Sequence, residues 1–387
     1  MRERASLGGW SARPVTAPEG QSVTFVELFF DLVFVFALTE VTSFAVNHLD
    51  AGGLTRALLI FWLVWWAWTQ WTWALNPADT EHGLVRLGTL TGTAVAFLMA
   101  VSLGRAFEEQ GGLWFVVPYV IVRVGGLSLY AWVTSEDSEQ FAAVRGFALF
   151  SVAGLASAVL GGFADPEARV WWWLGTVVLD LVAAGRSGRF GWNLHPDHFA
   201  ERHGLIVIIA LGESLIVSAV AVAGAEWRIE LAGVAIGAVL VTCLLWWTYF
   251  GWFNEALTER FGALSGAAQS TFGRDAYSLL HFPLVAGVVG IAVGFKVMVA
   301  HPEDVLDASV LMAFAGGVGT FLLSAAAIWA RAWSRVLWWR LVVPAVLYLV
   351  LLLAEDIPPS TVLALTAVAV AAIIAAEALR PPAPGST

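Results

Sequence analysis

The stretch FVELFFDLVFVFALTE, Phe25 to Glu40, lies in an apolar run that extends from about residue 23 to residue 47. A helix needs about 20 mostly apolar residues to cross a bilayer, and this run is long enough. It is mostly apolar over its whole length, whereas a strand of a membrane barrel would alternate apolar and polar residues over about 10 positions. In lipid, a helix pairs its own backbone polar groups. The stretch therefore predicts a transmembrane helix.

Similar apolar runs follow along the chain, and short connections rich in Gly, Pro, Asp and Glu separate them. They cover residues 53–75, 84–106, 112–133, 141–163, 168–185, 202–223, 229–253, 274–299, 306–330, 335–353 and 359–379. Of the 387 residues, 59% are hydrophobic and 13% are charged, against about 45–50% and 25% in a soluble domain. We therefore expect an all-α integral membrane protein with about twelve transmembrane helices.

Composition and charge also exclude several classes of protein. The hydrophobic content excludes a cytosolic enzyme and a disordered chain. A net charge of −10 leaves no basic footprint for nucleic acid. The single cysteine, Cys243, excludes an intrachain disulfide and a cysteine-based metal site.

The two ends of the chain, residues 1–20 and 381–387, are polar or proline-rich and predict disordered tails. The first apolar run is too long for a secretory signal and contains Glu27 and Asp31. With twelve spans both termini share one side of the membrane, and most of the arginines fall on that side. Because positive residues concentrate in cytoplasmic loops, we expect both termini to be cytoplasmic.

Two pairs of segments indicate an internal repeat. The segment Ala37–Glu40 is similar to Ala210–Glu213, and the Trp-rich segment Trp65–Trp68 is similar to Trp246–Tyr249. The matches occur in the same order along the chain, although Trp-rich helices can also look alike by chance. Parallel repeats with an even number of spans are a known transporter plan. The expected repeats comprise residues 21–190 and 191–380, and Asn76 and Asn254 close the two Trp-rich helices at repeat-related positions.

Charged residues inside the predicted spans are the main candidates for function, because charge within a membrane is costly and rare. Glu27 and Asp31 are four residues apart, so they share one face of the first span. Glu40 follows nine residues later, on the opposite face. Arg123 lies in the middle of the fourth span, and Asp180 lies in the sixth.

The seventh span and the residues before it carry a second charged group. His198 lies three and four residues before Glu201 and Arg202, and Glu213 lies eleven residues after Arg202. Helical spacing places His198, Arg202 and Glu213 on one face. Gly212 would let another helix approach closely beside Glu213.

Structural interpretations of these groups stay open. Glu27, Glu201 and Arg202 would then form interfacial ion pairs. Asp31 and Arg123 would form a buried structural pair. A metal site at the histidines before and within the seventh span is disfavoured, because His195, His198 and His203 cannot face one way on a regular helix. We expect no metal and no cofactor.

Two stretches, ELFFDLVFV from Glu27 and HFAERHGLIVIIALGES from His198, resemble the signatures of the bacterial low-temperature-requirement protein A (LtrA) family. The likeness covers roughly residues 20–380. It implies a polytopic protein of the bacterial cytoplasmic (inner) membrane and leaves the biochemical activity open. At His203 the family often has an apolar residue. The resemblance marks as signature positions Glu27, Asp31, His198, Glu201, Arg202 and Glu213.

The function that these residues favour is a transporter or channel for a small solute or ion. Glu40 and Glu213 would bind a cation or a proton between the first and seventh spans, because carboxylates in a low-dielectric cavity suit proton coupling. A cytoplasmic gate or charge relay would be formed by Glu27, Asp31, His198, Glu201 and Arg202. Arg123 is a further candidate for transport or binding.

Two alternatives belong to other classes. An intramembrane enzyme acting on a lipid-like substrate would use the His, Glu, Arg and Asp cluster for acid–base chemistry. The chain lacks a zinc-protease motif and a nucleophile elbow, so an enzyme is the less favoured alternative. A structural or signalling membrane protein is the third interpretation. The expected partners are membrane lipid and an unidentified small solute or ion, without nucleic acid, and association into a homo-oligomer is left open.

Overall fold

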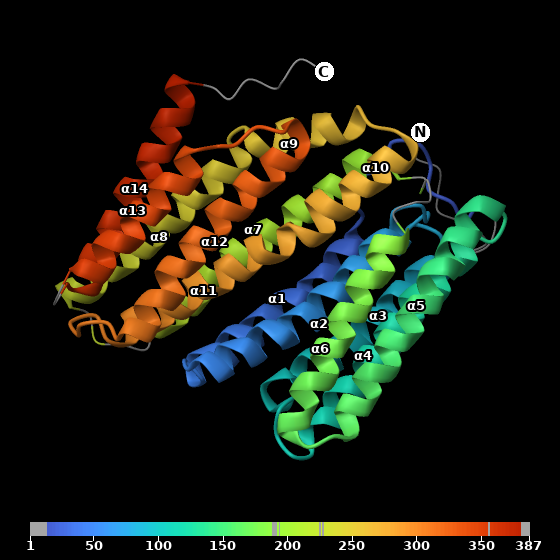
Figure 1. The fold of residues 1–387 in the computed structure, drawn as a ribbon, viewed down its shortest axis with the longest axis horizontal. Coiled ribbons are helices and arrows are strands. Elements are labelled where there is room, and N and C mark those ends of the chain that lie inside the picture. The colour runs from blue at the N-terminus through green and yellow to red at the C-terminus, as the bar shows by residue number, and fades with distance from the viewer. Residues whose placement is uncertain are drawn as a thin grey trace, which may run out of the picture. The chain divides into compact units, whose positions relative to one another are not determined.

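The computed structural model describes residues 14–187, 192, 194–223, 226, 228–354 and 357–380. Within these residues the regular elements are all helical (Figure 1). They are α1 (Phe25–Asn47), α2 (Ala51–Leu75), α3 (Gly83–Val101), η1 (Leu103–Arg105), α4 (Gly111–Val133), α5 (Ser138–Phe163), α6 (Pro166–Ser187), α7 (Pro196–Ala223), α8 (Ile229–Phe250), α9 (Phe253–Gly262), α10 (Gly266–Phe272), η2 (Gly273–Leu279), α11 (His281–Ala300), α12 (Ala308–Trp333), α13 (Trp339–Leu353) and α14 (Pro359–Leu379).

The expected all-α membrane architecture is confirmed. Among the described residues, ten helical segments are long and apolar enough to cross a membrane. Two of the twelve expected spans are weaker by this measure. α13 is apolar but has only 15 residues, and α6 is less apolar, since Arg169 and Asp180 lie along it.

Most helix bounds agree with the apolar runs to within a few residues, but the chain between α8 and α11 differs. We expected a connection over residues 254–273, and the structure instead has α9 and α10 there, while the π-helical segment η2 lies at the start of the expected ninth span. The apolar positions of α9, Phe253, Leu257 and Phe261, are fully buried at a spacing of four residues. An amphipathic helix with one buried stripe is too polar to count as an apolar run, although it is well packed.

Local sequence signals explain where several helices begin. The carboxylate of Asp137 accepts hydrogen bonds from the N–H groups of Glu139 and Gln140, both at 3.0 Å. Asp165 caps α6 in the same way. Backbone hydrogen bonds lower the pKa of Asp165, because they stabilise the ionised carboxylate. Pro196 stands at the first position of α7, where its missing N–H costs no intrahelical bond.

The chain divides into two compact units. Unit 1 comprises residues 1–40, 58–203 and 264–274, and unit 2 comprises residues 41–57, 204–263 and 275–387. In unit 1, α3 packs on α4, α4 on α5 and α5 on α6. In unit 2, α11 packs on α12, α14 on α8 and α12 on α13. The predicted repeats at residues 21–190 and 191–380 stay a prediction.

Arg169 of α6 holds together the connections at one end of unit 1. The side chain is fully buried, and its guanidinium donates to the carbonyl oxygens of Ala106, Glu108, Gly161 and Ala164 at 2.6 to 3.1 Å. These carbonyls belong to the α3–α4 connection and to the C-terminal end of α5. A cation suits such a place, because the last carbonyls of a helix carry partial negative charge.

In unit 2 glycines allow α11 and α12 to approach closely. A Cβ atom added at Gly287 would lie 2.6 Å from the carbonyl oxygen of Gly317, and one added at Gly317 would meet the carbonyl of Gly287 at the same distance. Small residues at helix crossings permit this contact in membrane proteins.

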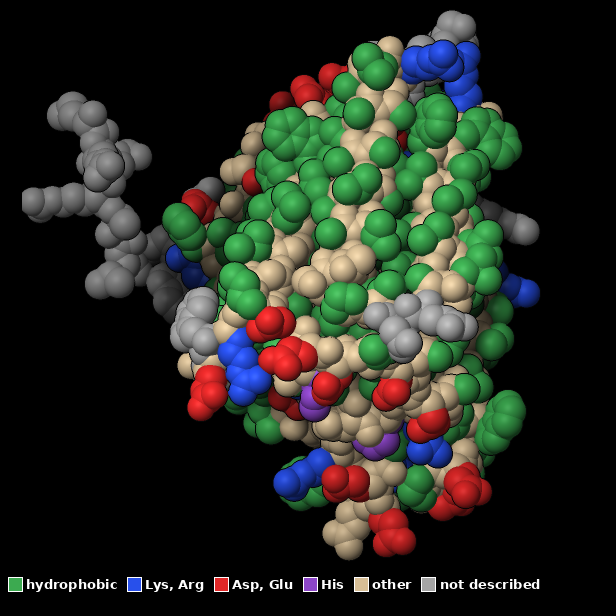
Figure 2. Space-filling view, turned by 90° about the vertical axis from the view of Figure 1, so that its left-hand side faces the viewer, with side chains coloured by type: hydrophobic (Ala, Val, Ile, Leu, Met, Phe, Trp, Pro, Cys, Tyr) green, Lys and Arg blue, Asp and Glu red, His purple; other side chains and the backbone are tan. Residues whose placement is uncertain are grey.

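The outer surface suits a lipid environment. Large hydrophobic side chains are exposed on many helices, and examples are Leu149, Trp171 and Val220 at 70% or more. Figure 2 shows hydrophobic side chains over much of the face it draws, with the acidic side chains gathered mainly in its lower part. Large apolar exposure of this kind marks a surface that contacts lipid or another protein.

Candidate functional site

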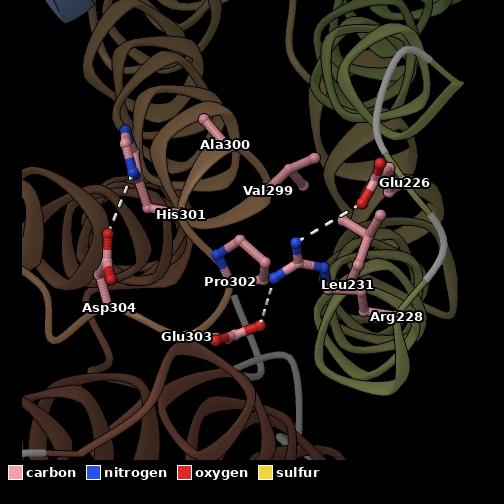
Figure 3. Close-up of a pocket in the computed structure, with 9 residues that line it drawn as sticks. All are labelled: Glu226, Arg228, Leu231, Val299, Ala300, His301, Pro302, Glu303 and Asp304. Atoms are coloured by element: carbon pink, nitrogen blue, oxygen red, sulfur yellow. Dashed lines mark hydrogen bonds and ion pairs between the residues drawn. The ribbon is translucent and has the colours of Figure 1, made fainter.

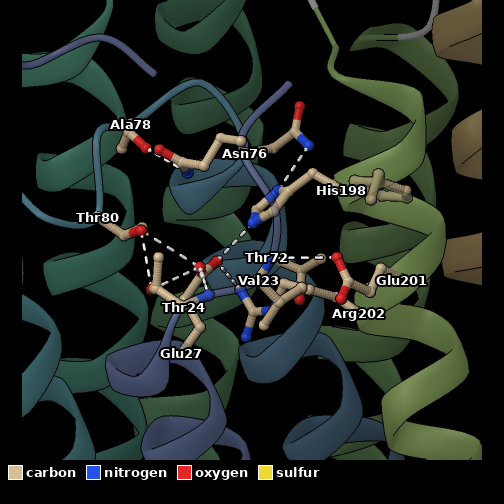
Figure 4. A network of polar contacts seen from close by, with 12 residues as sticks. Val23, Thr24, Glu27, Thr72, Asn76, Ala78, Thr80, His198, Glu201 and Arg202 are labelled. Atoms are coloured by element: carbon tan, nitrogen blue, oxygen red, sulfur yellow. Dashed lines mark hydrogen bonds and ion pairs between the residues drawn. The ribbon is translucent and has the colours of Figure 1, made fainter. Parts of the chain in front are cut away.

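Two pairs of titratable residues from α1 and α7 meet inside unit 1, and Figure 4 shows three of them, Glu27, His198 and Arg202. They are Glu27 and Asp31 of α1 with His198 and Arg202 of α7, and we call these four residues the α1–α7 charge network. Each side chain is at most 1% exposed. Both pairs are spaced by four residues, so each pair lies on one face of its helix. These four of the sequence candidates on the two helices are therefore brought together.

Arg202 bridges the two carboxylates. Its Nη2 atom donates to Oδ1 of Asp31 at 2.5 Å, and its Nη1 atom lies 3.6 Å from Oε1 of Glu27. Trp68 of α2 also donates its indole N–H to Oδ1 of Asp31 at 2.8 Å. The guanidinium carbon lies 5.8 Å from the centre of the Trp68 ring, within the range of a cation–π interaction.

Glu27 is surrounded by hydrogen-bond donors. Its Oε2 atom accepts from the N–H and the hydroxyl of Thr24, at 3.0 and 2.9 Å, and from the hydroxyl of Thr80 at 3.3 Å. Its Oε1 atom lies 3.0 Å from Nε2 of His198. Donors that converge on a carboxylate favour its ionised form. Glu27 therefore carries a negative charge in this arrangement.

The tautomer of His198 follows from its neighbour Asn76, which comes directly after α2. The amide of Asn76 donates from Nδ2 to the carbonyl of His195 at 3.0 Å and accepts from the N–H of His195 at 2.9 Å. These two bonds fix which end of the amide carries hydrogen. The same Nδ2 lies 3.2 Å from Nδ1 of His198. Nδ1 is therefore an acceptor, and Nε2 carries the hydrogen that faces Glu27.

The network consequently places two carboxyl groups, those of Glu27 and Asp31, around one guanidinium, that of Arg202. Among the described residues, Oδ2 of Asp31 and Nε and Nη1 of Arg202 also make no hydrogen bond. Uncompensated buried charge is expensive. The arrangement is suited to taking up a proton or a cation.

Residues 16–23, which precede α1, are held against the turn after α2 and against α7. Thr16 forms an antiparallel bridge with Ala78, and the amide of Gln21 donates to the carbonyl of Ala78 at 3.0 Å. The N–H of Val23 donates to Oε2 of Glu201 at 3.0 Å. Glu201, a predicted site residue, is exposed and holds this segment, while the network lies beneath it.

Arg123 belongs to a different group of unit 1. Its guanidinium donates to both oxygens of Asp180 at 3.0 and 3.3 Å, to the hydroxyl of Tyr119 at 2.5 Å, and to the side-chain oxygen of Gln70. Arg123 and Asp180 are fully buried. The structural pair that we considered between Asp31 and Arg123 is wrong, because Asp31 pairs with Arg202 and Arg123 with Asp180. The spacing of charged residues along one helix cannot show which other helix supplies the ion-pair partner.

Glu40 and Glu213 lie in different units. Glu40 belongs to unit 1 and is partly exposed, with its carboxylate near Gly104 of η1. Glu213 belongs to unit 2 and is 4% exposed. Their placement across a shared path stays a prediction.

Three contributors to the network were not proposed from the sequence. Thr24 and Glu27 have the spacing of a helix capping box, in which the side chain at the third helical position bonds the capping N–H, and this signal could have found Thr24. Trp68 was considered as part of the Trp-rich segment that indicates a repeat. For Thr80 the sequence offers no signal, because only the turn after α2 brings it to Glu27.

No three His, Cys, Asp or Glu side chains in the described part of the chain lie close enough to hold a metal ion. His203 instead bonds the carbonyl of Phe199 at 2.9 Å, and its ring packs edge-on against Trp68.

Unit 2 has a polar pocket of about 380 Å³ between the connections that precede α8 and follow α11 (Figure 3). Arg228 donates to Glu303 at 2.9 Å and lies 3.6 Å from Glu226, while His301 lies 3.1 Å from Asp304. Exposed ion pairs of this kind contribute little to stability. The pocket contains none of the predicted site residues.

The long apolar helices and the buried charge network define a multi-pass α-helical membrane protein. The sequence profile described as Bacterial low temperature requirement A protein (LtrA) matches residues 22–376, and the chain belongs to this family. An uncharacterised protein of Rhizobium meliloti (strain 1021), RA0937, is 30% identical over 332 residues, which cover 81% of this chain and 78% of that protein. No solved structure matches the chain.

Proposed function

We propose that this protein is a transporter or channel for a small solute or ion, and that the α1–α7 charge network is a gate or relay on its path. One observation carries the proposal: two buried carboxyl groups, those of Glu27 and Asp31, share one arginine, Arg202. With both carboxyl groups ionised and His198 neutral, the network holds one more negative than positive charge. Intramembrane ionisable groups most often mark ion pathways or proton relays. We further propose a location in the bacterial inner membrane with both termini in the cytoplasm, as the arginine distribution favours.

Acids extend along the depth of α1, with Glu40 on the opposite face of the helix from Glu27 and Asp31, and we propose that they belong to one path. Glu27, Asp31 and Glu40 stand on one helix, and thirteen residues separate the first from the last. At about 1.5 Å per residue this is about 20 Å, a large part of the hydrocarbon thickness. On α7, Glu213 extends the acidic positions beyond Arg202 in the same way. We include Glu40 and Glu213 as the groups that receive the ion beyond the network.

Because the network is buried, a surplus charge in it is energetically costly and favours uptake of a cation. An ion taken out of water costs several kcal/mol unless a partner compensates it. A proton or small cation that joins the network would remove the surplus, and its departure would restore it. A site that alternates between these two states can couple binding at one side of the membrane to release at the other.

The test is ion flux into liposomes that contain the purified protein. Proton entry is followed with an entrapped pH-sensitive dye under an imposed membrane potential, and a panel of monovalent cations is measured in parallel. Glu27→Gln removes the surplus charge and should reduce the flux at least tenfold. Glu167→Gln, an exposed acid in the first turn of α6, is the matched control and should leave it unchanged. Flux that survives Glu27→Gln and Asp31→Asn would sink the proposal.

A further inference from the structure

We propose that the coupling ion is a proton bound at Nδ1 of His198, and that Asn76 is the positioning residue that transmits its arrival to the start of α7. This inference rests on the transport function proposed above. It assigns to Asn76 a role beyond closing α2, and it names the chemical species that the network exchanges.

The Asn76 amide is fully committed in the present state. Its oxygen accepts from the N–H of His195, and its nitrogen donates both to the carbonyl of His195 and to Nδ1 of His198. An amide has two donor hydrogens on nitrogen and an acceptor oxygen. Asn76 therefore bonds both backbone groups of His195, the residue before α7, and also donates to the unprotonated nitrogen of His198. We call these three hydrogen bonds the Asn76 clasp.

A proton on His198 is incompatible with this clasp. When water delivers a proton to the lone pair of Nδ1, the new N–H points at the N–H of the Asn76 amide, so two donors face each other. Rotating the amide by half a turn would present its oxygen to His198. The same rotation would set N–H against the N–H of His195 and oxygen against its carbonyl. In either orientation, hydrogen bonds between Asn76 and the two histidines are lost.

The surrounding charges favour the proton that Asn76 opposes. The imidazole lies 3.0 Å from Glu27 of α1 and close to His195, just before its own helix, and Arg202 of that helix joins Glu27 to Asp31. With His198 protonated, two carboxylates would balance two cations. The network therefore stabilises the protonated state, and the clasp stabilises the neutral state. Opposed terms of this kind produce two states that an ion can switch.

The Asn76 clasp also links protonation of His198 to the backbone at the start of α7. Both backbone groups of His195 bond to Asn76, and Pro196 begins α7 at the next residue. Loss of these bonds frees the start of α7 from the end of α2, and α7 carries the network residue Arg202. Proton uptake at His198 is thus linked to release of the helix that holds the bridging cation.

The first experiment measures the tautomer directly. Protein labelled with ¹⁵N-histidine is placed in lipid nanodiscs, and the His198 signals are assigned by their loss in His198→Gln. At neutral pH we expect the Nε2–H tautomer. A neutral Nδ1–H tautomer would overturn the inference without bearing on whether the protein transports anything.

The second experiment measures proton flux as a function of pH for Asn76→Asp. The carboxylate would accept from a protonated Nδ1, so the midpoint of the flux profile should move to higher pH by about one unit or more. Asn254→Asp, at the repeat-related position in unit 2, is the matched control and should leave the midpoint unchanged. An unchanged midpoint in Asn76→Asp, with flux still abolished by Glu27→Gln, would refute the role of Asn76 and keep the proposed function. Flux that persists in Glu27→Gln would refute the function itself. If Asn76→Asp does not fold, the tautomer measurement on the unaltered protein decides.

Discussion

The α1–α7 charge network and the Arg123–Asp180 pair are both buried in unit 1 and both centre on an arginine, but they differ in charge and in saturation. Arg123 faces one carboxylate, and all three of its nitrogens donate hydrogen bonds. Arg202 faces two carboxylates, and two of its nitrogens make no hydrogen bond. A balanced, saturated pair has nothing to gain from an added ion. The comparison therefore separates a group that holds helices together from one that is ready to bind an ion.

Unit 2 contains a second pair of the balanced kind. Arg340 of α13 donates to both oxygens of Glu377 of α14, at 2.7 and 3.0 Å, and to the carbonyl of Thr248 at 2.8 Å. Its guanidinium also lies 5.4 Å from the ring centre of Trp252. One positive charge meets one negative charge, as for Arg123, although Nη1 of Arg340 makes no hydrogen bond among the described residues. We assign this pair to helix packing as well.

The largest effect that tests the comparison is expected for Arg123→Ala. Removing one partner leaves the charge of Asp180 buried, which costs about 3–5 kcal/mol. Thermal unfolding of the purified protein in detergent measures the loss. Replacing both residues, as Arg123→Met with Asp180→Leu, should recover most of it and leave proton flux intact. If the recovered double variant lacked flux, Arg123 would belong to the transport path, as the sequence candidates included it.

A smaller effect on stability is expected for Asp31→Asn, which turns the network into a balanced Glu27–Arg202 pair. The asparagine oxygen keeps the bond from Arg202 but loses its charge, so the cost is about 1 kcal/mol. Flux should nevertheless fall at least tenfold, because the surplus charge has gone. The same two assays, unfolding and flux, check both parts. A destabilisation as large as that of Arg123→Ala would show that Asp31 is a packing residue.

Thr80→Val should act more weakly still. It removes the longest hydrogen bond to Glu27, at 3.3 Å, and a hydrogen bond contributes about 0.5–1.5 kcal/mol. The midpoint of the flux profile should move slightly to higher pH, since the ionised carboxylate loses a donor. Thr91→Val on α3 is the control, because its hydroxyl only bonds the carbonyl of Leu87 in its own helix. Equal shifts in both variants would contradict a specific role for Thr80.

The smallest effect concerns His195 and the pH dependence of folding. Burial, reinforced by the nearby His198, lowers the pKa of His195 from its ordinary value of 6.5. The unfolded chain then binds a proton more readily than the folded one. This contribution to stability is complete above pH 6.5 and is lost as the pH falls below it. His195→Gln keeps the backbone groups that bond Asn76 and should flatten this part of an unfolding curve measured across pH. An unaltered slope would assign the acid sensitivity to other groups.

Much of the helical architecture could be predicted, because an apolar run long enough to cross a membrane has few alternatives. The helices α9 and α10 were missed, since α9 buries only one face and α10 has only 7 residues. Helical spacing also selected all four network residues, because it places Glu27 with Asp31 and His198 with Arg202. It could not show that the two faces meet, nor that Asp180 rather than Asp31 neutralises Arg123. Those contacts join residues distant in sequence, and only the packing of different helices decides them.

Arg169 has a consequence of its own. Its guanidinium is held by main-chain carbonyl oxygens, which neither gain nor lose protons, and arginine itself stays charged at any pH a cell experiences. The hydrogen bonds between Arg169 and the two connections that it joins should therefore not depend on pH. In the mechanism that we propose, proton uptake at His198 would alter the first turn of α7, while this junction in unit 1 would keep its hydrogen bonds at either pH.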